Sequence, residues 1–206
     1  MRPLRLLVFD RTCTGSGRRP GLSDAWRAGK GLYGALGRLD GGRGVASWAE
    51  ALAWLEQRSR DAGTPIGEVQ FWGHGRRGRA MVDRESLDLG SLRPGASHFD
   101  ALCKLRSRLL PAAGSSIWFR TCETLGGPAG HTFAPALADF LGARVAGHTH
   151  VIGFWQSGLH SLQPGALPHW PEDEGVLEDP ASVAAGSSPL APHTIQCLRG
   201  TIPAGW

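Results

Sequence analysis

The chain has 206 residues and 41% of them are apolar, which predicts a folded domain with a substantial core and excludes a globally disordered chain. The formal net charge is only +4, and apart from a local cluster at 76–79 the arginines are scattered, so no nucleic-acid-binding surface is predicted. No apolar run approaches the roughly 20 residues that a membrane span requires. Thirty glycines and fourteen prolines indicate many loops, short of the composition of a low-complexity chain.

The cysteines and the N-terminus predict a cytoplasmic protein. The cysteines lie too far apart in the sequence for a CxxC metal or redox pair, so free thiols are expected at Cys13, Cys103, Cys122 and Cys197. The apolar run at 4–9 follows Arg2, as in a signal peptide, but it is too short and ends in Asp10-Arg11. We therefore interpret it as a buried first strand.

Strand and helix patterns alternate through the first three quarters of the chain. Short apolar runs predict strands at residues 4–9, 68–72, 117–121 and 144–146. Residues 148–152 are expected to extend the last of these strands. Helical spacing of apolar residues predicts helices at 47–60, 99–110 and 131–141. Ser47 and Glu50 form a capping box at the start of the first helix, and Pro135 is expected in the first turn of the last. Residues 24–39 fit a helix or an irregular cover, and 76–90 a short hairpin or loop.

This order of elements predicts a three-layer α/β/α sandwich around a mostly parallel central sheet. We interpret residues 1–206 as a single domain with its core in about 1–162, where 154–162 fits a strand or hairpin. Residues 163–192 are rich in Pro and Gly, carry acidic residues at 172–174 and 178–179, and predict a surface loop that is either a solvated linker or a regulatory segment. Residues 193–206 predict a late strand that returns to the sheet, followed by a tail.

Two of the predicted strands end in residues that can carry out nucleophilic catalysis. Gly73-His74-Gly75 closes the strand at 68–72, and Cys122 follows the strand at 117–121 before a Gly-rich turn. Ligands bind at the carboxyl ends of strands in parallel α/β sheets, so we expect the imidazole and the thiol to meet. His74 would accept the proton of Cys122, and the helix that follows would lower the pKa of the thiol. The backbone amides of Gly75 and Cys122 would face a developing oxyanion.

Together these motifs resemble the caspase–gingipain–metacaspase clan of cysteine peptidases, and short bacterial caspase-like domains in particular. The matching residues, within about 1–155, are Gly73-His74-Gly75 and Ile117-Trp118-Phe119-Arg120-Thr121-Cys122 with Gly126-Gly127. The resemblance implies a caspase–haemoglobinase fold with the dyad on two adjacent parallel strands. It implies that Cys122 is the nucleophile, His74 the imidazole and the Gly75 amide an oxyanion donor. The His-before-Cys separation is close to the roughly 50 residues of caspases.

The chain departs from the sequence signature of caspases, and its substrate preference stays open. The caspase signature Gln-Ala-Cys-x-Gly is absent, since Arg120-Thr121-Cys122-Glu123-Thr124 stands there, which weakens the caspase subfamily more than the clan. Clan members cleave after Asp, Arg, Lys or Asn. Asp10 and Arg11 follow the first strand, where some relatives place substrate-binding residues. Asp10 would favour a basic residue before the scissile bond and Arg11 an acidic one, and both alternatives stay open.

We predict a cysteine endopeptidase that cleaves a protein or peptide substrate through a thioester and needs no metal or organic cofactor. The alternative is a catalytically inactive caspase-like binding or scaffold module in a bacterial defence or signalling assembly, with a regulatory protein partner. A further alternative is a zinc-dependent hydrolase that uses His148 and His150, with His131 near Cys122. The other three cysteines are expected to be structural.

Overall fold

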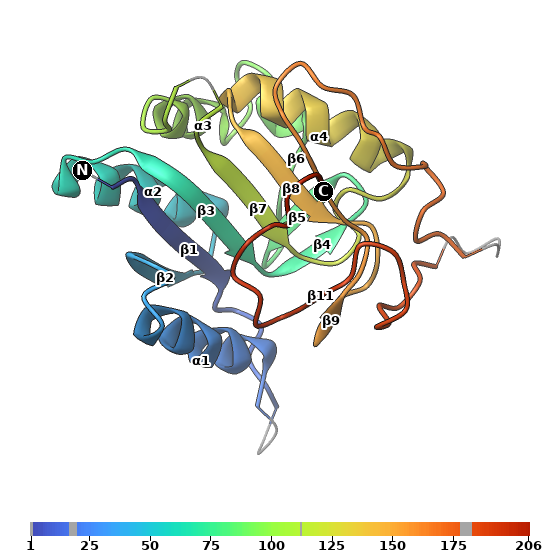
Figure 1. Ribbon diagram of the computed structural model, residues 1–206. Helices are drawn as coiled ribbons and strands as arrows, with labels where there is room; N and C mark the ends of the chain where they lie inside the picture. Colours follow the sequence, from blue (N-terminus) through green and yellow to red (C-terminus); the bar gives the residue numbers. More distant parts are fainter. Residues whose placement is uncertain (1, 17–19, 112, 178–182) are drawn as a thin grey trace.

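A six-stranded, mostly parallel sheet forms the centre of the protein (Figure 1), in a computed structural model that describes residues 2–16, 20–111, 113–177 and 183–206. The strand order is β10-β8-β7-β3-β1-β2. The bounds are β1 (Leu4–Asp10), β2 (Gly41–Val45), β3 (Ile66–Trp72), β7 (Ser116–Arg120), β8 (Arg144–His148) and β10 (Leu159–Leu162). All neighbours pair in parallel except β10, which runs antiparallel to β8.

Three helices cover one face of the sheet, and they are α2 (Trp48–Ala62), α3 (Phe99–Arg106) and α4 (Gly127–Leu141). Alternate residues of a strand point to opposite faces. Val8 and Phe71 accordingly pack in one large apolar cluster with residues of these helices, such as Leu55 and Leu137. This cluster is the main core of the protein.

The other face carries α1 (Leu22–Ala35) and the C-terminal segment, residues 193–206. Leu7 and Trp72, which neighbour Val8 and Phe71 in the sequence, pack with Tyr33 of α1 on this face. Trp118 of β7 packs there with Ile195 and, at the edge, Trp206. The predicted three-layer α/β/α sandwich is therefore confirmed.

Two small sheets complete the fold. One is antiparallel and consists of β4 (His74–Arg76), β5 (Arg79–Val82) and β6 (Glu85–Asp88), followed by a short 3-10 helix at Leu89–Leu92. The other pairs β9 (Trp155–Gln156) with β11 (Ile195–Gln196). The predicted hairpin at 76–90 is thus a three-stranded sheet, and His74 begins its first strand.

Several predicted elements differ from the observed ones. Strand β2 was not predicted, because its sequence Gly-Gly-Arg-Gly-Val is poor in the residues that favour strands. Of the late strand predicted within 193–206, Ile195–Gln196 forms β11, which pairs with β9 and does not return to the central sheet. The extension of β8 through 148–152 is also wrong, since β8 ends at His148. The helix predicted at 99–110 ends at Arg106.

Helix α4 begins four residues before the predicted start. Gly126 is its N-cap and a proline, Pro128, lies in its first turn, a position where the missing amide hydrogen costs nothing. Pro135 therefore lies inside the helix. The prediction that it lies in the first turn is wrong. Pro135 leaves the carbonyl of His131 without the usual helical hydrogen bond. The region left open at 24–39 does form a helix, α1.

Ser47 and the acidic loop are the remaining points of comparison. Ser47 caps α2 as predicted, because its side chain accepts a hydrogen bond from the amide of Glu50. The reciprocal half of the predicted capping box does not form, because the Glu50 carboxylate accepts a hydrogen bond from the amide of Ala46 and not from that of Ser47. Residues 178–179 of the acidic loop lie outside the described residues. Within the described ranges, no helix is both long and apolar enough to cross a membrane.

Candidate functional site

His74 and Cys122 lie at the carboxyl ends of two neighbouring parallel strands. Trp72 and Arg120 are partners in the register of β3 and β7. His74 and Cys122 each follow two residues later, just beyond the ends of the two strands. Both line a cavity of about 600 Å³. The structure therefore brings the imidazole and the thiol to one cavity.

The walls of this cavity are mostly apolar. Helix α1 contributes Leu22, Trp26 and Leu32, and the opposite wall comes from the segment at 151–154 and from Leu198. Several of these side chains remain exposed, among them Phe154 at 55%. A volume of this size lies in the range of ligand-binding pockets.

Cys122 lies in a tight turn between β7 and α4. Glu123 has a left-handed backbone, with a φ of 42°, and its amide donates a hydrogen bond to the carbonyl of His150 at 3.0 Å. Positive φ at a residue other than Gly is strained and concentrates at functional sites. The Cys122 thiol is half-buried and lies 4.0 Å from the carbonyl oxygen of Ile152. The turn thus holds the thiol against the cavity.

The pKa of the Cys122 thiol lies above its usual value, mainly because the thiol is buried. A backbone hydrogen bond from Ile152 lowers the pKa, and the charge of Glu123 raises it further. The expectation of a lowered thiol pKa is therefore wrong, because desolvation is the largest cause and raises it. At neutral pH the group is a thiol and needs a base to become nucleophilic.

His74 is exposed, and its closest polar contact is with a different cysteine. Its Nε2 atom lies 3.3 Å from Sγ of Cys13, and its ring packs edge-on against Trp26 with 6.0 Å between ring centroids. Among the described residues no hydrogen bond joins His74 to Cys122. Catalytic hydrogen bonds are often long in free enzymes and shorten when substrate binds, so this arrangement is compatible with a dyad.

Cys13 was expected to be structural, and its contact with His74 was not predicted. It lies in the loop between β1 and α1, and it does not line the cavity. The path of an irregular loop cannot be read from apolar periodicity, so this contact was not predictable from the sequence. Cys13 is therefore the residue that must be tested beside Cys122.

Gly75 lies directly against the turn that carries Cys122. A Cβ atom at this position would lie 2.4 Å from Oγ1 of Thr124 and 2.5 Å from the carbonyl oxygen of Cys122. Only glycine allows the two segments to approach this closely. The contact places the backbone of Gly75 beside Cys122, as a shared oxyanion site requires, and the role of their amides stays a prediction.

Asp10 and Arg11 do not line the cavity. The Asp10 side chain is buried and accepts hydrogen bonds from the amide and the hydroxyl of Thr12, both at 2.7 Å, so it fixes the loop after β1. Arg11 is exposed and pairs with Glu50 at 3.3 Å. Nothing in this geometry supports a role for either residue in substrate binding.

Arg120 is the charged residue that does line the cavity. It is 4% exposed, and its guanidinium donates hydrogen bonds to Oε1 of Gln156, to the Tyr33 hydroxyl at 2.6 Å and to the carbonyl of Cys197 at 2.6 Å. It also lies over the Trp118 ring, with 4.6 Å from Cζ to the centroid. Burial lowers the pKa of this guanidinium.

The charge of Arg120 has no close counterion among the described residues. Within the described part of the chain no carboxylate lies within 4.0 Å of it, although the more distant Glu68 acts on it electrostatically. Burial raises the pKa of the Glu68 carboxyl. The raised pKa disfavours the charged carboxylate and so weakens its electrostatic effect on Arg120. Arg120 was not singled out from the sequence, although a charged residue at the end of a buried strand was a usable signal.

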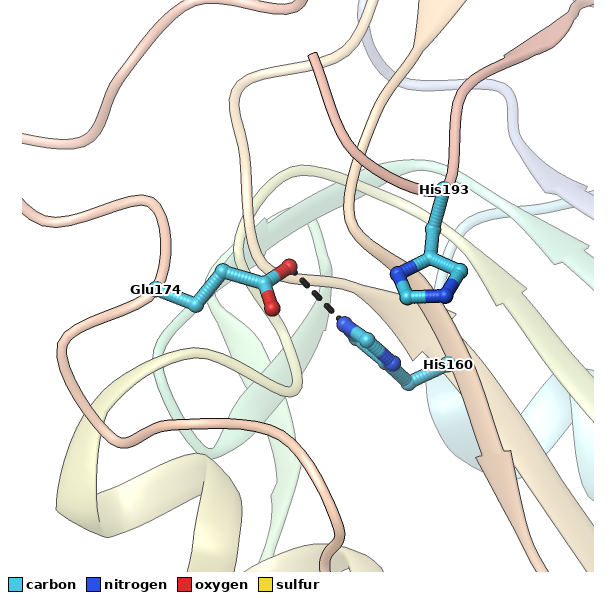
Figure 2. Close-up of side chains that lie close together, drawn as sticks. All are labelled: His160, Glu174 and His193. Atoms are coloured by element: carbon cyan, nitrogen blue, oxygen red, sulfur yellow. Dashed lines mark hydrogen bonds and ion pairs between the residues drawn. The ribbon is translucent and has the colours of Figure 1, made fainter.

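The histidines considered for a zinc site do not come together. His148 is fully buried with its Nδ1 3.1 Å from the carbonyl of Ser157, and Nδ1 of His150 lies 2.9 Å from the Thr149 hydroxyl. His131 lies near Glu172, at 4.0 Å. In the described ranges, the one group with metal-ligand geometry is a different one, His160, Glu174 and His193 (Figure 2).

Comparisons with protein-family models, with curated proteins and with solved structures gave no match. Function must therefore be inferred from the site itself. It combines a half-buried thiol, an exposed imidazole and a buried cation around an apolar cavity. These groups suit covalent chemistry on a carbonyl compound.

Proposed function

We propose that this chain is a cysteine endopeptidase with Cys122 as the nucleophile and His74 as the general base and acid. The observation that carries the proposal is that the two residues follow adjacent parallel strands and line one cavity. The resemblance to the caspase–gingipain–metacaspase clan supports it, since that clan carries its dyad on two such strands. The missing caspase signature is the main departure from it.

The chemistry follows from the state of the two side chains. His74 takes the proton of the Cys122 thiol, whose raised pKa makes a base necessary. The thiolate attacks the carbonyl carbon of the scissile peptide bond, and the amides of Gly75 and Cys122 stabilise the oxyanion. His74 then gives the proton to the leaving amine, which departs as a thioester forms. Water hydrolyses the thioester and restores the thiol.

One movement must precede this reaction. The His74 ring has to turn from Cys13 toward Cys122, and an exposed imidazole can do so at little cost. A bound peptide that fills the cavity beside Trp26 would favour the new position, because it removes water from the space between the ring and the thiol.

The cavity favours a peptide with an acidic residue before the scissile bond. A buried cation is costly unless an anion lies near it, and Arg120 lacks a close carboxylate among the described residues. An aspartate side chain in the cavity would supply that charge. The exposed apolar side chains at the rim, such as Leu32 and Phe154, would contact the neighbouring residues of a protein substrate.

The free thiols support a cytoplasmic location for this enzyme. All four cysteines are unpaired, as expected in a reducing compartment. We expect a regulatory protein partner to control such a thiol peptidase.

Labelling with peptidyl acyloxymethyl ketones tests the proposal. The chain is incubated with probes that carry Asp, Arg, Lys or Asn before the reactive ketone, and adducts are mapped by intact and peptide mass. We expect one adduct, on Cys122, with the Asp probe preferred. Cys122→Ala should abolish it, and His74→Ala should slow it strongly.

Cys13→Ala is the matched control and should label at the wild-type rate. An adduct on Cys13 in place of Cys122 would move the nucleophile to the loop after β1. Preference for the Arg or Lys probe would remove the role given to Arg120. No adduct with any probe would favour the second candidate function.

That second candidate is a caspase-like binding module without turnover. Two observations favour it: His74 contacts Cys13 instead of Cys122, and burial keeps Cys122 protonated. In such a module the apolar cavity would bind a peptide segment without cleaving it. A peptide that binds reversibly and stays intact over hours would support this function.

A further inference from the structure

Three potential metal ligands converge at the edge of the sheet formed by β10. His160 lies on β10, Glu174 in the loop that follows, and His193 just before β11. Their ligand atoms all lie within 4.8 Å of one another. Figure 2 shows the carboxylate of Glu174 directed at the ring of His160, with the His193 ring beside it and one of its nitrogens turned toward the carboxylate.

Burial distinguishes this group from a chance cluster on the surface. His160 is 1% exposed, and its Nε2 lies 2.8 Å from Oε1 of Glu174. The Nδ1 atom of His193 is buried and has no hydrogen-bond partner among the described residues. A buried polar atom without a partner costs free energy, and a bound cation would remove that cost.

The backbone of His193 is also held in an unusual conformation. Its φ is 47°, in the left-handed region that residues other than Gly seldom adopt. Its carbonyl accepts a hydrogen bond from the amide of Leu159 on β10, at 3.0 Å. Strain of this kind persists where surrounding contacts fix a functional geometry. The conformation brings the ring to Glu174 and His160.

We propose that His160, Glu174 and His193 bind one divalent transition-metal ion, with Zn²⁺ as the preferred occupant. Two imidazoles and one carboxylate are a common zinc ligand set, and water would complete the tetrahedron. Imidazole ligands disfavour Mg²⁺ and Ca²⁺, which select oxygen. The site is separate from the Cys122 cavity, and it does not depend on the proposed peptidase activity.

The role of this ion is to fasten the long loop to the wall of the cavity. Glu174 also accepts a hydrogen bond from the Thr149 hydroxyl at 3.0 Å. A Cβ atom on Gly175 would lie 2.4 Å from the Thr149 carbonyl oxygen, so the loop lies tightly on this segment. Val151 and Ile152, which follow Thr149, line the cavity, and Ile152 accepts the contact from Cys122. An ion at Glu174 would therefore hold the segment that faces the thiol.

Metal binding to the purified full-length chain tests the site. The chain is stripped with a chelator, titrated with ZnCl₂ against a competing zinc indicator, and analysed for bound metal. We expect one Zn²⁺ per chain and a rise in Tm of about 5 °C or more at saturation. Glu174→Gln and His193→Gln should each weaken binding by more than about tenfold.

Neighbouring residues of the same kind provide the matched controls. Glu172→Gln changes an exposed carboxylate two positions away, and His169→Gln an exposed histidine of the same loop; both should bind Zn²⁺ as the wild type does. Wild-type affinity in Glu174→Gln and His193→Gln would overturn the proposal, as would a wild-type chain that binds no zinc.

Two further measurements keep the result independent of folding and of catalysis. Zinc K-edge absorption of the wild-type complex should show nitrogen and oxygen neighbours only, and a sulfur neighbour would place the ion on a cysteine and overturn the site. The titration is repeated with Cys122→Ala, which removes the proposed nucleophile. If Cys122→Ala still binds zinc, the metal site does not depend on the proposed nucleophile. This conclusion holds whether or not the peptide probes label the wild type.

Discussion

A single methyl group at Gly75 should disable the candidate site. In Gly75→Ala the new Cβ would lie 2.4 Å from Oγ1 of Thr124 and 2.5 Å from the Cys122 carbonyl oxygen, so the turn that carries the thiol must move. Displacement of a reacting group by about 1 Å can cost roughly 100-fold in rate, and we expect a loss of about that size in kcat/KM on the preferred peptide.

A second glycine provides the control for this prediction. Gly31→Ala, on α1, adds a methyl group with nothing within 4 Å, and it should leave kcat/KM unchanged. Circular dichroism should show that both variants are folded. Wild-type turnover in Gly75→Ala would mean that the close approach of β4 to the Cys122 turn has no part in catalysis.

At this scale the sequence located some residues of the site and missed others. His74 and Cys122 could be found because each follows an apolar run that ends a parallel strand, and strand ends of this kind meet by geometry alone. The partners of Arg120 and the contact made by Cys13 could not be predicted in the same way. The first depend on which residues of α1 and the C-terminal segment surround Arg120, and the second on the path of an irregular loop.

Helix α1 and the C-terminal segment are joined through one hydroxyl, that of Tyr33. It accepts a hydrogen bond from Nη1 of Arg120 at 2.6 Å, and it lies 2.9 Å from the carbonyl oxygens of Cys197 and Arg199. Tyr33→Phe would leave a buried guanidinium hydrogen without an acceptor. We expect the free energy of unfolding to fall by about 2 kcal/mol, as measured by urea denaturation.

The comparison for Tyr33→Phe comes from the C-terminal end of the same helix. Leu36 is 54% exposed, and Leu36→Ala should change the free energy of unfolding by less than about 0.5 kcal/mol. If Tyr33→Phe were equally mild, Arg120 would have another acceptor, and the hydroxyl would not couple the two elements.

Elements with a strong apolar pattern were predictable, and those fixed by tertiary contacts were not. β3, β7 and α2 follow from runs and stripes of apolar residues. β2 forms although its residues disfavour strands, because the edge of β1 offers it a parallel partner. The metal-ligand group shares this property, since Glu174 and His193 lie in segments without periodicity.

One face of the sheet carries the main apolar core, and the other carries the candidate site. The face under α2, α3 and α4 holds the large continuous apolar cluster. The opposite face has two smaller clusters, and between them lie Arg120, His74 and Cys122 around the cavity. Substitutions in the cavity should therefore change reactivity with modest effects on folding, except at buried polar groups such as Arg120 and Tyr33.

His148 links the stability of the whole molecule to pH. Burial lowers its pKa from 6.5 to about 3, and the nearby charges of Arg120, His160 and His150 act in the same direction, although the bond to Ser157 opposes them. The folded protein keeps this histidine neutral, whereas the unfolded chain protonates it near pH 6.5. Its contribution is therefore complete above about pH 6.5 and is lost progressively as the pH falls toward 3.

The expected slope is about 1.4 kcal/mol per pH unit in that interval, because one more proton binds to the unfolded chain. His148→Asn cannot titrate, and its amide can replace the hydrogen bond from Nδ1 to the Ser157 carbonyl. Urea denaturation of both proteins at several pH values between about 4 and 7 measures the difference. The wild type should lose stability more steeply than the variant as the pH falls. Parallel curves would mean that His148 takes up its proton in the folded state, and that the junction of β8 and β10 admits water.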